Sequence, residues 1–269
     1  MTPHRPELIW HDVQQIRSTA PLVHNITNFV VMNNTANALL ALGASPVMAH
    51  AIEEVRDMVR IARALVLNIG TLSASWVEAM LAAGQQANEL SVPVVIDPVG
   101  AGATPFRDET LRRLLATVRP TALRGNASEI RALYLAEQVT KGVDSTHATE
   151  EAGAAAKAMA ERLNCVVCVS GPIDLVFGQG RLIRIANGHS MMPRVTGLGC
   201  TASALIGAFL AVNPTPVEAV AHAMAIMGIC GEMAAEKSPG PGSLQQHFLD
   251  ALHRITGDDV ERSLRWNEA

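Results

Sequence analysis

A glycine-rich approach to a helix, at residues 195–211 (VTGLGCTASALIGAFLA), is the first place where the residue types of this chain suggest chemistry. Gly197, Gly199 and Cys200 stand where a loop should turn into a helix, and the small residues 202–204 let that helix pack closely. The first turn of a helix has unpaired backbone N–H groups and the positive end of the helix dipole, so such an approach suits a phosphate group. On this stretch alone, an anion site and a plain helix start with a buried cysteine are equally well supported.

Two carboxylates and an arginine could complete such a site. Asp97 ends an apolar run and precedes glycines (VVIDPVGAGA), while Glu129 stands three residues after Asn126 in RGNASEI. Asn and Glu at this spacing are typical of a reciprocal capping pair at a helix start, which on its own is the more frequent role. A carboxylate beside Arg124 and near a second carboxylate could also hold Mg²⁺ through water. The capping role does not exclude the metal role.

Cys200 is the one cysteine of the four in a position of chemical interest. Cys165 and Cys168 have CxxC spacing, but they lie in NCVVCVSG, whose β-branched residues favour a strand. Residues three apart in a strand point to opposite faces, which argues against a shared metal ion or a redox pair. Four cysteines in a chain of this length do not make a disulfide scaffold. We therefore expect Cys165, Cys168 and Cys230 to be small core residues.

Length and composition favour a globular protein with a small-molecule partner. With 269 residues, 49% of them hydrophobic, the chain can bury a large core, and no linker divides it, so we predict a single domain over residues 1–269. A net charge of -4 without a run of Lys or Arg argues against nucleic acid as a partner. No apolar signal segment is present, and residues 202–212 and 216–235 are interrupted by glycines or polar residues. We therefore expect no membrane span and a cytoplasmic protein.

Apolar runs that alternate with helical patterns must position the site. We predict strands at residues 44–48, 65–69, 92–96, 121–123 and 165–169. We predict helices at residues 8–18, 33–42, 52–64, 73–90, 106–118, from 126 onward, 148–163, 200–212, 216–236 and 243–255. Uniformly apolar strands separated by helices are typical of a mostly parallel sheet buried on both faces. Runs at residues 175–177 and 182–185, separated by GQGR, predict a hairpin that adds an antiparallel edge.

Polar residues and glycines follow nearly every predicted strand. They are Gly70 and Thr71, the segment 97–102, the segment 124–126, and Ser170 with Gly171. Ligands of open parallel sheets bind at the carboxyl ends of the strands. We therefore expect a single site at that edge. The P-loop ending GK[ST], a GxGxxG after the first strand and HExxH are all missing from the sequence, which makes those three kinds of site poor fits.

Five ordered blocks of the sequence are ITNFVVMNNTANALLALGASPVMAHA, VVIDPVGAGATPFR, LRGNASEI, VSGPIDLVFG and VTGLGCTASALIGAFLA. Together they resemble the hydroxyethylthiazole kinase family of the ribokinase-like superfamily, from about residue 21 to beyond residue 209. The resemblance implies a three-layer α/β/α ribokinase-like fold and phosphorylation of the alcohol of 4-methyl-5-(2-hydroxyethyl)thiazole by ATP. It also implies Mg²⁺ as cofactor and a homotrimer with active sites at subunit interfaces.

The resemblance also implies the roles of particular residues. They form a catalytic group of Cys200, Gly197 and Gly199, a substrate group of Met48, Gly197, Asn25 and Thr27, an ATP group of Arg124, Ser170 and Asn126, and a metal group of Glu129 and Asp97. In this arrangement the backbone N–H groups of residues 197–200 would hold the γ-phosphoryl oxygens.

Cys200 occupies the position where relatives in the superfamily commonly have an aspartate as general base. A helix N-terminus lowers the pKa of a thiol, so a thiolate base is chemically possible. Our hypothesis is that Cys200 is a weak base or a positioning residue. Leu198 departs from the small or polar residue that is more frequent at its place in the family.

Two other functions stay open at this point. Another ribokinase-like kinase, acting on a pyrimidine or a sugar alcohol, would share the phosphate half of the site. A sensor of the same fold without catalysis is the non-enzyme alternative, against which the presence of both Asp97 and Glu129 argues.

Overall fold

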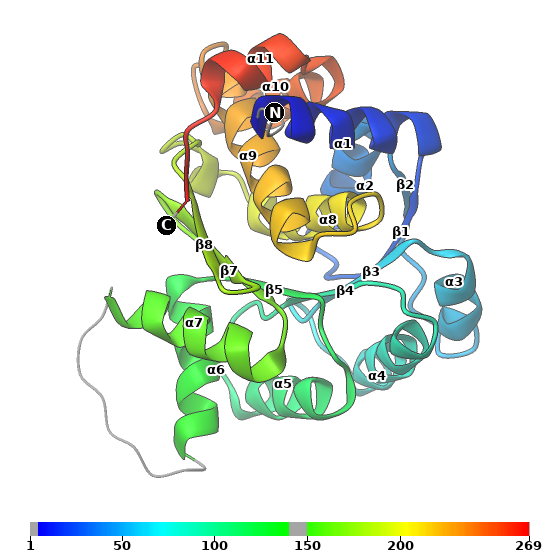
Figure 1. Cartoon of the computed structure of the whole chain (residues 1–269). Coiled ribbons are helices and arrows are strands. Elements are labelled where there is room, and N and C mark those ends of the chain that lie inside the picture. Colours follow the sequence, from blue (N-terminus) through cyan, green and yellow to red (C-terminus); the bar gives the residue numbers. More distant parts are fainter. Residues whose placement is uncertain (1–4, 140–149, 269) are drawn as a thin grey trace.

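A nine-stranded sheet forms the centre of the computed structural model, which describes residues 5–139 and 150–268 (Figure 1). The strands are β1 (Leu22–Ile26), β2 (Ser45–Val47), β3 (Ala64–Asn68), β4 (Val94–Asp97), β5 (Ala122–Asn126), β6 (Val166–Ser170), β7 (Asp174–Gly178), β8 (Arg181–Ile185) and β9 (Trp266–Glu268). Their order is β2-β1-β3-β4-β5-β6-β7-β8-β9. The strands from β2 to β6 in this order pair in parallel, and β7 to β9 pair antiparallel. The predicted α/β fold with an antiparallel edge hairpin is confirmed.

Helices cover both faces of the sheet, which gives three layers (Figure 1). One face carries α1 (Arg5–Thr19), α2 (Met32–Leu42), α8 (Leu198–Leu210), α9 (Pro216–Ala235), α10 (Pro241–Arg254) and α11 (Gly257–Ser263). The other carries α3 (Val55–Ile61), α4 (Ala74–Glu89), α5 (Pro105–Thr117), α6 (Ala127–Val139) and α7 (Glu150–Leu163). Alternate residues of the central strands β1, β3, β4, β5 and β6 enter two separate apolar cores, one on each face of the sheet. Residues 148 and 149 of the predicted seventh helix lie outside the described residues.

The two cysteines of the CxxC pair lie just before β6 and within it, and they face opposite sides of the sheet. Cys168 belongs to the core under α8 and α9, whereas Cys165 belongs to the core on the opposite face. Both thiols are free and buried, and burial raises the pKa of Cys165 to about 12. The prediction that these cysteines are core residues is confirmed.

Several elements differ from the pattern-based predictions. Strand β1 was not predicted because His24 and Asn25 interrupt its apolar residues, yet both side chains are buried inside the sheet. Strand β9, with the sequence WNE, carries no apolar alternation and pairs only with β8 at the sheet edge. Helix α8 begins at Leu198, two residues before the predicted start, because Gly197 rather than Gly199 forms its N-cap.

Helix α9 corrects one sequence argument. Within the described ranges, it is the one helix long and apolar enough to cross a membrane. Its glycines and polar residues therefore do not exclude a membrane span on composition, as the sequence argument assumed. It nevertheless runs through the core between α8 and α10, with 83% of its apolar window buried. Its hydrophobicity is accounted for by packing inside the protein.

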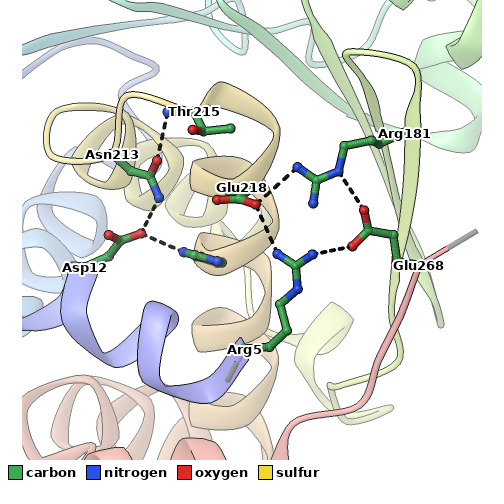
Figure 2. Close-up of polar contacts among 8 residues, drawn as sticks. Arg5, Asp12, Arg181, Asn213, Thr215, Glu218 and Glu268 are labelled. Carbon is green, nitrogen blue, oxygen red and sulfur yellow. Dashed lines mark hydrogen bonds and ion pairs between the residues drawn. The ribbon is translucent and has the colours of Figure 1, made fainter. Parts of the chain in front are cut away.

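Four charged side chains join the two ends of the described chain (Figure 2). Arg5 contacts Glu218 (3.0 Å) and Glu268 (2.7 Å), and Arg181 contacts the same two carboxylates at 3.2 and 2.6 Å. The four residues come from α1, β8, α9 and β9. Because each arginine pairs with both carboxylates, the four side chains form a network rather than isolated ion pairs. This network connects the polar strand β9 to the rest of the sheet, at an edge where few apolar side chains are buried.

Asp12 lies in a second polar cluster beside this network, between α1 and α9 (Figure 2). Its Oδ2 atom accepts from Asn213 Nδ2 (2.7 Å) and contacts His222 Nδ1 at 2.6 Å, and Asp12 and His222 are almost fully buried. Replacing Asp12 by alanine leaves the buried His222 and the partly buried Asn213 without this acceptor, and an enclosed group without its partner costs about 1–3 kcal/mol. We expect Asp12→Ala to lower the free energy of unfolding by about 2–4 kcal/mol in denaturant titrations.

Asp57→Ala is the matched control, because Asp57 is exposed and paired only with Arg60 one turn away. It should change the free energy of unfolding by less than about 0.5 kcal/mol. Equal effects of the two substitutions would show that the buried cluster contributes nothing specific.

Candidate active site

The predicted site residues gather at the carboxyl edge of the parallel strands. Asp97 ends β4, Arg124 lies in β5, Asn126 ends β5 and Ser170 ends β6. The strands β4, β5 and β6 are neighbours in the sheet, so these residues lie next to one another. The N-terminus of α8 reaches the same edge, because Ser203 in its second turn bonds to Asp97.

The start of α8 requires glycine at position 197. Gly197 has a φ of 85°, and a Cβ atom there would come within 2.7 Å of Val31 Cγ1. The first hydrogen bond of the helix runs from Thr201 N to the carbonyl oxygen of Gly197 (2.8 Å). The N–H groups of residues 198–200 consequently have no partner within the helix and form its positive end.

Arg124 lies directly against this helix start. A Cβ atom on Gly199 would stand only 2.9 Å from Arg124 Nη1, so the close approach of the guanidinium depends on the glycine. Nη2 of Arg124 donates to Ser170 Oγ at 2.7 Å, and Ser170 Oγ donates to the carbonyl oxygen of Gly125 at 3.3 Å. A cation at the positive end of a helix is electrostatically unfavourable on its own. The arrangement therefore favours an anion bound between Arg124 and α8.

A chain of hydrogen bonds, buried except at Cys200, connects Cys200 to Asp97 across three strand ends. Asn28 Nδ2 lies 3.5 Å from Cys200 Sγ and donates to Asn68 Oδ1 at 2.8 Å. Asn68 Nδ2 donates to Asp97 Oδ2 at 2.8 Å, and Ser203 Oγ donates to the same oxygen at 2.8 Å. Because Cys200 and Ser203 share α8, the bonds close a ring that joins β1, β3, β4 and α8.

The orientation of the Asn68 amide is fixed by the backbone. Gly70 N–H can only donate, and it donates to Asn68 Oδ1 at 2.9 Å. The Nδ2 group must therefore face Asp97. Asn68 and Asp97 are essentially inaccessible to solvent, so the bond between them is not exchanged for water.

Asp97 is a buried carboxylate with an unused oxygen. Its Oδ1 atom has no hydrogen-bond partner, whereas Oδ2 accepts two bonds. Burial raises the pKa of the Asp97 carboxyl from its ordinary value of 3.8 to about 6, although the Arg124 guanidinium and the donated hydrogen bonds oppose the shift. The group is therefore ionised at neutral pH, with a free oxygen inside the site.

Cys200 does not have the electrostatics of a reactive thiolate. Burial raises the pKa of its thiol to about 11, and the negative charge of Asp97 adds to the effect. The expectation of a lowered pKa is wrong, because burial disfavours the charged thiolate and the nearby Asp97 carboxylate disfavours it further. The thiol is protonated at neutral pH.

Glu129 and Asn126 form the reciprocal capping pair that their spacing predicts. Glu129 N donates to Asn126 Oδ1 (2.9 Å), and Asn126 N donates to Glu129 Oε2 (2.8 Å). The second carboxylate oxygen, Oε1, accepts from Gly100 N at 3.0 Å. Glu129 thus holds the turn after β4 and the start of α6 in one place. No group of three or more His, Cys, Asp or Glu residues spaced for a metal ion occurs in residues 5–139 and 150–268.

The predicted substrate residues lie on the side of the sheet that ends at β2. Asn25 and Thr27 are buried in and just after β1, and Asn25 Oδ1 has no partner. Met48 is partly exposed and directly follows β2, which β1 and β3 separate from β4. Within one chain, Met48 is therefore set apart from Asp97 rather than brought beside it.

Sequence reasoning missed Asn68 and Ser203 as site residues. Asn68 is the one polar residue in the apolar run LVLNI, and it stands one position before the strand's predicted end. A polar residue there, in a strand buried on both faces, was the available signal. Ser203 had no such signal, because a small residue in a packed helix is equally well explained by packing.

Comparison with known proteins agrees with this geometry. The model of the hydroxyethylthiazole kinase family matches residues 13–258. The chain is 59% identical over 261 residues to a curated hydroxyethylthiazole kinase of Syntrophus aciditrophicus (strain SB), and the match covers 97% of each chain. The solved structure of hydroxyethylthiazole kinase from Pyrococcus horikoshii OT3 superposes with a TM-score of 0.91 at 44% identity, covering 98% of this chain and 99% of that one.

A more distant solved structure has the same fold. A ribokinase-like superfamily protein from Enterococcus faecalis V583 has a TM-score of 0.62 at 16% identity, over 88% of each chain. The family model spans most of the chain, and the relatives are similar over nearly their whole length. The chain therefore belongs to the hydroxyethylthiazole kinase family, within the ribokinase-like fold.

Proposed function

We propose that this protein transfers the γ-phosphoryl group of ATP to the hydroxyethyl oxygen of 4-methyl-5-(2-hydroxyethyl)thiazole. The observation that carries the proposal is the pairing of Arg124 with the free N-terminus of α8 through the contact at Gly199. Phosphoryl transfer asks mainly for positioning and for neutralisation of charge on the phosphoryl oxygens. Membership of the family supports the thiazole alcohol as the acceptor.

In this mechanism the N–H groups of residues 198–200 and the guanidinium of Arg124 bind the phosphoryl oxygens. Both are held in place before the substrate arrives, by Gly197 at the helix start and by the bond from Arg124 to Ser170. Preorganised donors of this kind stabilise charge without a cost of reorientation during the reaction. Asn126 and Ser170, at the ends of β5 and β6, are proposed to line the nucleotide side.

The residues that were predicted to hold Mg²⁺ fit that ion. Asp97 Oδ1 is a buried carboxylate oxygen without a partner, and each Glu129 oxygen accepts one N–H bond and keeps a lone pair. Oxygen ligands, one or two carboxylates together with water and phosphate, are the usual set for Mg²⁺. Bound there, the ion would supply positive charge to the phosphate oxygens. Asp97 and Glu129 are proposed to hold it.

The proton of the substrate alcohol must be accepted or shared as the phosphoryl group arrives. The protonated thiol of Cys200 is poorly suited to accept it, and we propose that Cys200 positions the alcohol. Cys200→Ala should then retain at least a tenth of the wild-type kcat, whereas loss of a general base costs about 10²–10⁴. Cys200→Asp should be at least as active as Cys200→Ala, because a carboxylate at this place can also accept a proton. A Cys200→Asp enzyme slower than Cys200→Ala, measured by steady-state kinetics, would contradict this role of Cys200.

A homotrimer with sites between subunits is part of the proposal. Phe29, Val30 and Leu40 are 67%, 65% and 59% exposed, and they lie just before and within α2, which packs beside β2. A neighbouring subunit on this surface would cover them and would bring a second chain to Met48. Light scattering on the purified protein should give three times the mass of one chain. A monomer with full activity would contradict interfacial sites.

ADP release with different alcohols separates this function from its competitors. The purified protein is incubated with ATP, Mg²⁺ and either the thiazole alcohol, pyridoxal or hydroxymethylpyrimidine. The proposal predicts a kcat/KM at least 100-fold higher for the thiazole alcohol than for the other two. A preference for another acceptor would indicate a different kinase, and the absence of ADP release with all three would favour a sensor. A cytoplasmic location, where ATP is available, belongs to the same proposal.

A further inference from the structure

Arg107 bridges the two loops that follow β3 and β4. It stands in the first turn of α5, and its side chain is partly buried. Nη1 donates to the carbonyl oxygens of Ile69 (2.5 Å) and Val99 (2.7 Å), and Nη2 donates to the carbonyl oxygen of Gly70 (2.8 Å). One guanidinium therefore bonds three backbone carbonyls from two separate loops.

The chemistry of the guanidinium explains why arginine stands here. Three carbonyl oxygens that converge on one place repel one another, and each needs a donor when water is excluded. Arginine presents its N–H donors in a planar, rigid fork, whereas lysine offers a single ammonium group on a flexible stem. The fit is close, because a Cβ atom added to Gly100 would lie 3.3 Å from Arg107 Nε.

The loop after β3 leads to the acceptor side of the site. Gly70 N is the donor that orients the Asn68 amide toward Asp97. Thr71 Oγ1, the next residue of the loop, accepts from the backbone N–H of Phe29 at 3.1 Å. The position of this loop therefore affects both the Asp97 carboxylate and the segment that leaves β1.

The loop after β4 leads to the nucleotide side. Gly100 is adjacent to Val99, and its N–H donates to Glu129 Oε1. The other oxygen of Glu129 holds the N–H of Asn126 at the end of β5. Arg107 is thus hydrogen-bonded directly to both loops: the one that binds Glu129 through Gly100, and the one that orients Asn68 through Gly70.

We propose that Arg107 is a positioning residue of the phosphoryl-transfer site, which sets the distance between its acceptor side and its nucleotide side by clamping the two loops together. It acts through Asn68 with Asp97 and through Gly100 with Glu129. The proposal rests on the proposed kinase function for its catalytic consequence. Its structural consequence, the ordering of the two loops, does not depend on the substrate.

The test compares Arg107→Met and Arg107→Lys with Arg113→Met. Arg113 lies on the same helix and pairs with Glu78 at the surface, which makes it a matched control for loss of a guanidinium from α5. Hydrogen exchange read by mass spectrometry reports on the amides of Gly70, Gly100 and Ala101, and steady-state kinetics report on kcat and on KM for ATP and the alcohol.

We expect Arg107→Met to exchange these loop amides at least 10-fold faster and to lower kcat at least 10-fold, with each KM changed less than 3-fold. Misplacement of reacting groups lowers the rate more than it lowers ground-state binding. Arg107→Lys should fall between Arg107→Met and wild type in both readouts and should fold even if Arg107→Met does not. Arg113→Met should match wild type.

Unchanged loop exchange in both Arg107 variants would overturn the clamp. Faster exchange with a wild-type kcat would overturn the positioning role. If the wild-type protein itself phosphorylates no alcohol, the proposed function fails, and the exchange experiment still decides whether Arg107 orders the loops.

Discussion

Asp97→Asn is expected to lower kcat by at least 100-fold. It is also expected to remove the loss of folding stability that the Asp97 carboxyl causes as the pH rises. The catalytic loss follows from the free Oδ1 atom of a carboxylate placed beside Arg124 and the start of α8. Loss of a positioned charge or proton acceptor in such sites costs about 10²–10⁴ in rate. The amide keeps the shape of the side chain and can still accept the bonds from Asn68 and Ser203.

The sign of the stability effect follows from the raised pKa. The Asp97 carboxyl has a pKa of about 6 in the folded protein against an ordinary value of 3.8, so the folded state binds its proton more tightly than the unfolded state. This contribution to wild-type stability is fully present below pH 3.8 and is lost as the pH rises through about 6. Asparagine does not titrate, so the variant lacks this loss. Between pH 4 and pH 8 the variant should gain about 2 kcal/mol relative to wild type.

Urea titrations at several pH values measure this difference, with Asp57→Asn as the control. Asp57 is exposed, and its replacement should leave the pH dependence of unfolding the same as in wild type. Parallel stability curves for Asp97→Asn and wild type from pH 4 to pH 8 would contradict the buried, charged carboxylate. Full activity of the variant would contradict its place in the site.

Arg124→Met is expected to lower kcat/KM for ATP by about 10²–10³, the range seen when a charge-stabilising donor is removed from an active site. The guanidinium touches the helix start at Gly199 and is oriented by Ser170, so its charge is aimed at one place. Arg124→Lys should recover only part of the loss, because an ammonium group cannot both bond to Ser170 and reach α8. Arg60→Met, which removes an exposed arginine, should have wild-type kinetics.

Gly199→Ala tests the same contact from the other side. The added methyl group would stand 2.9 Å from Arg124 Nη1 and must displace it, so about a 10-fold loss of kcat/KM for ATP is expected. Gly242→Ala is the matched control, because a Cβ atom there meets nothing within 4 Å.

An Arg124→Met enzyme with an unchanged KM for ATP and an unchanged kcat would show that no phosphate binds between Arg124 and α8.

Much of this fold follows from local patterns in the sequence. The apolar runs of β3, β4 and β6 and the capping pair of Asn126 with Glu129 depend on residues close together in the chain, and they were predicted. Placing Asp97 and Arg124 at one edge needed only the rule that parallel strands end on the same side. Strand β9 could not be predicted, because its pairing with β8 is accompanied by ion pairs of Glu268 with Arg5 and Arg181, which lie more than 80 residues away in the sequence.

The electrostatics of the site could not be read from the sequence. The sheet order places β3 between β1 and β4, and only this order lets Asn68 join Asn28 to Asp97. The same neighbourhood raises the pKa of Cys200, whereas the local sequence pointed to a lowered value. Local patterns identify which residues stand at helix and strand ends, but burial and distant charges set their chemistry.

The central claim, phosphoryl transfer at the start of α8, is tested most directly by following the phosphoryl group itself. ATP labelled with ¹⁸O at the three non-bridging oxygens of the γ-phosphoryl group is incubated with the purified protein, Mg²⁺ and the thiazole alcohol, and the products are read by mass spectrometry. We predict a thiazole phosphate that carries all three labelled oxygens, formed by the wild-type protein and at least 100-fold more slowly by Arg124→Met. Labelled inorganic phosphate without any labelled thiazole phosphate, or equal rates for the two proteins, would contradict the account.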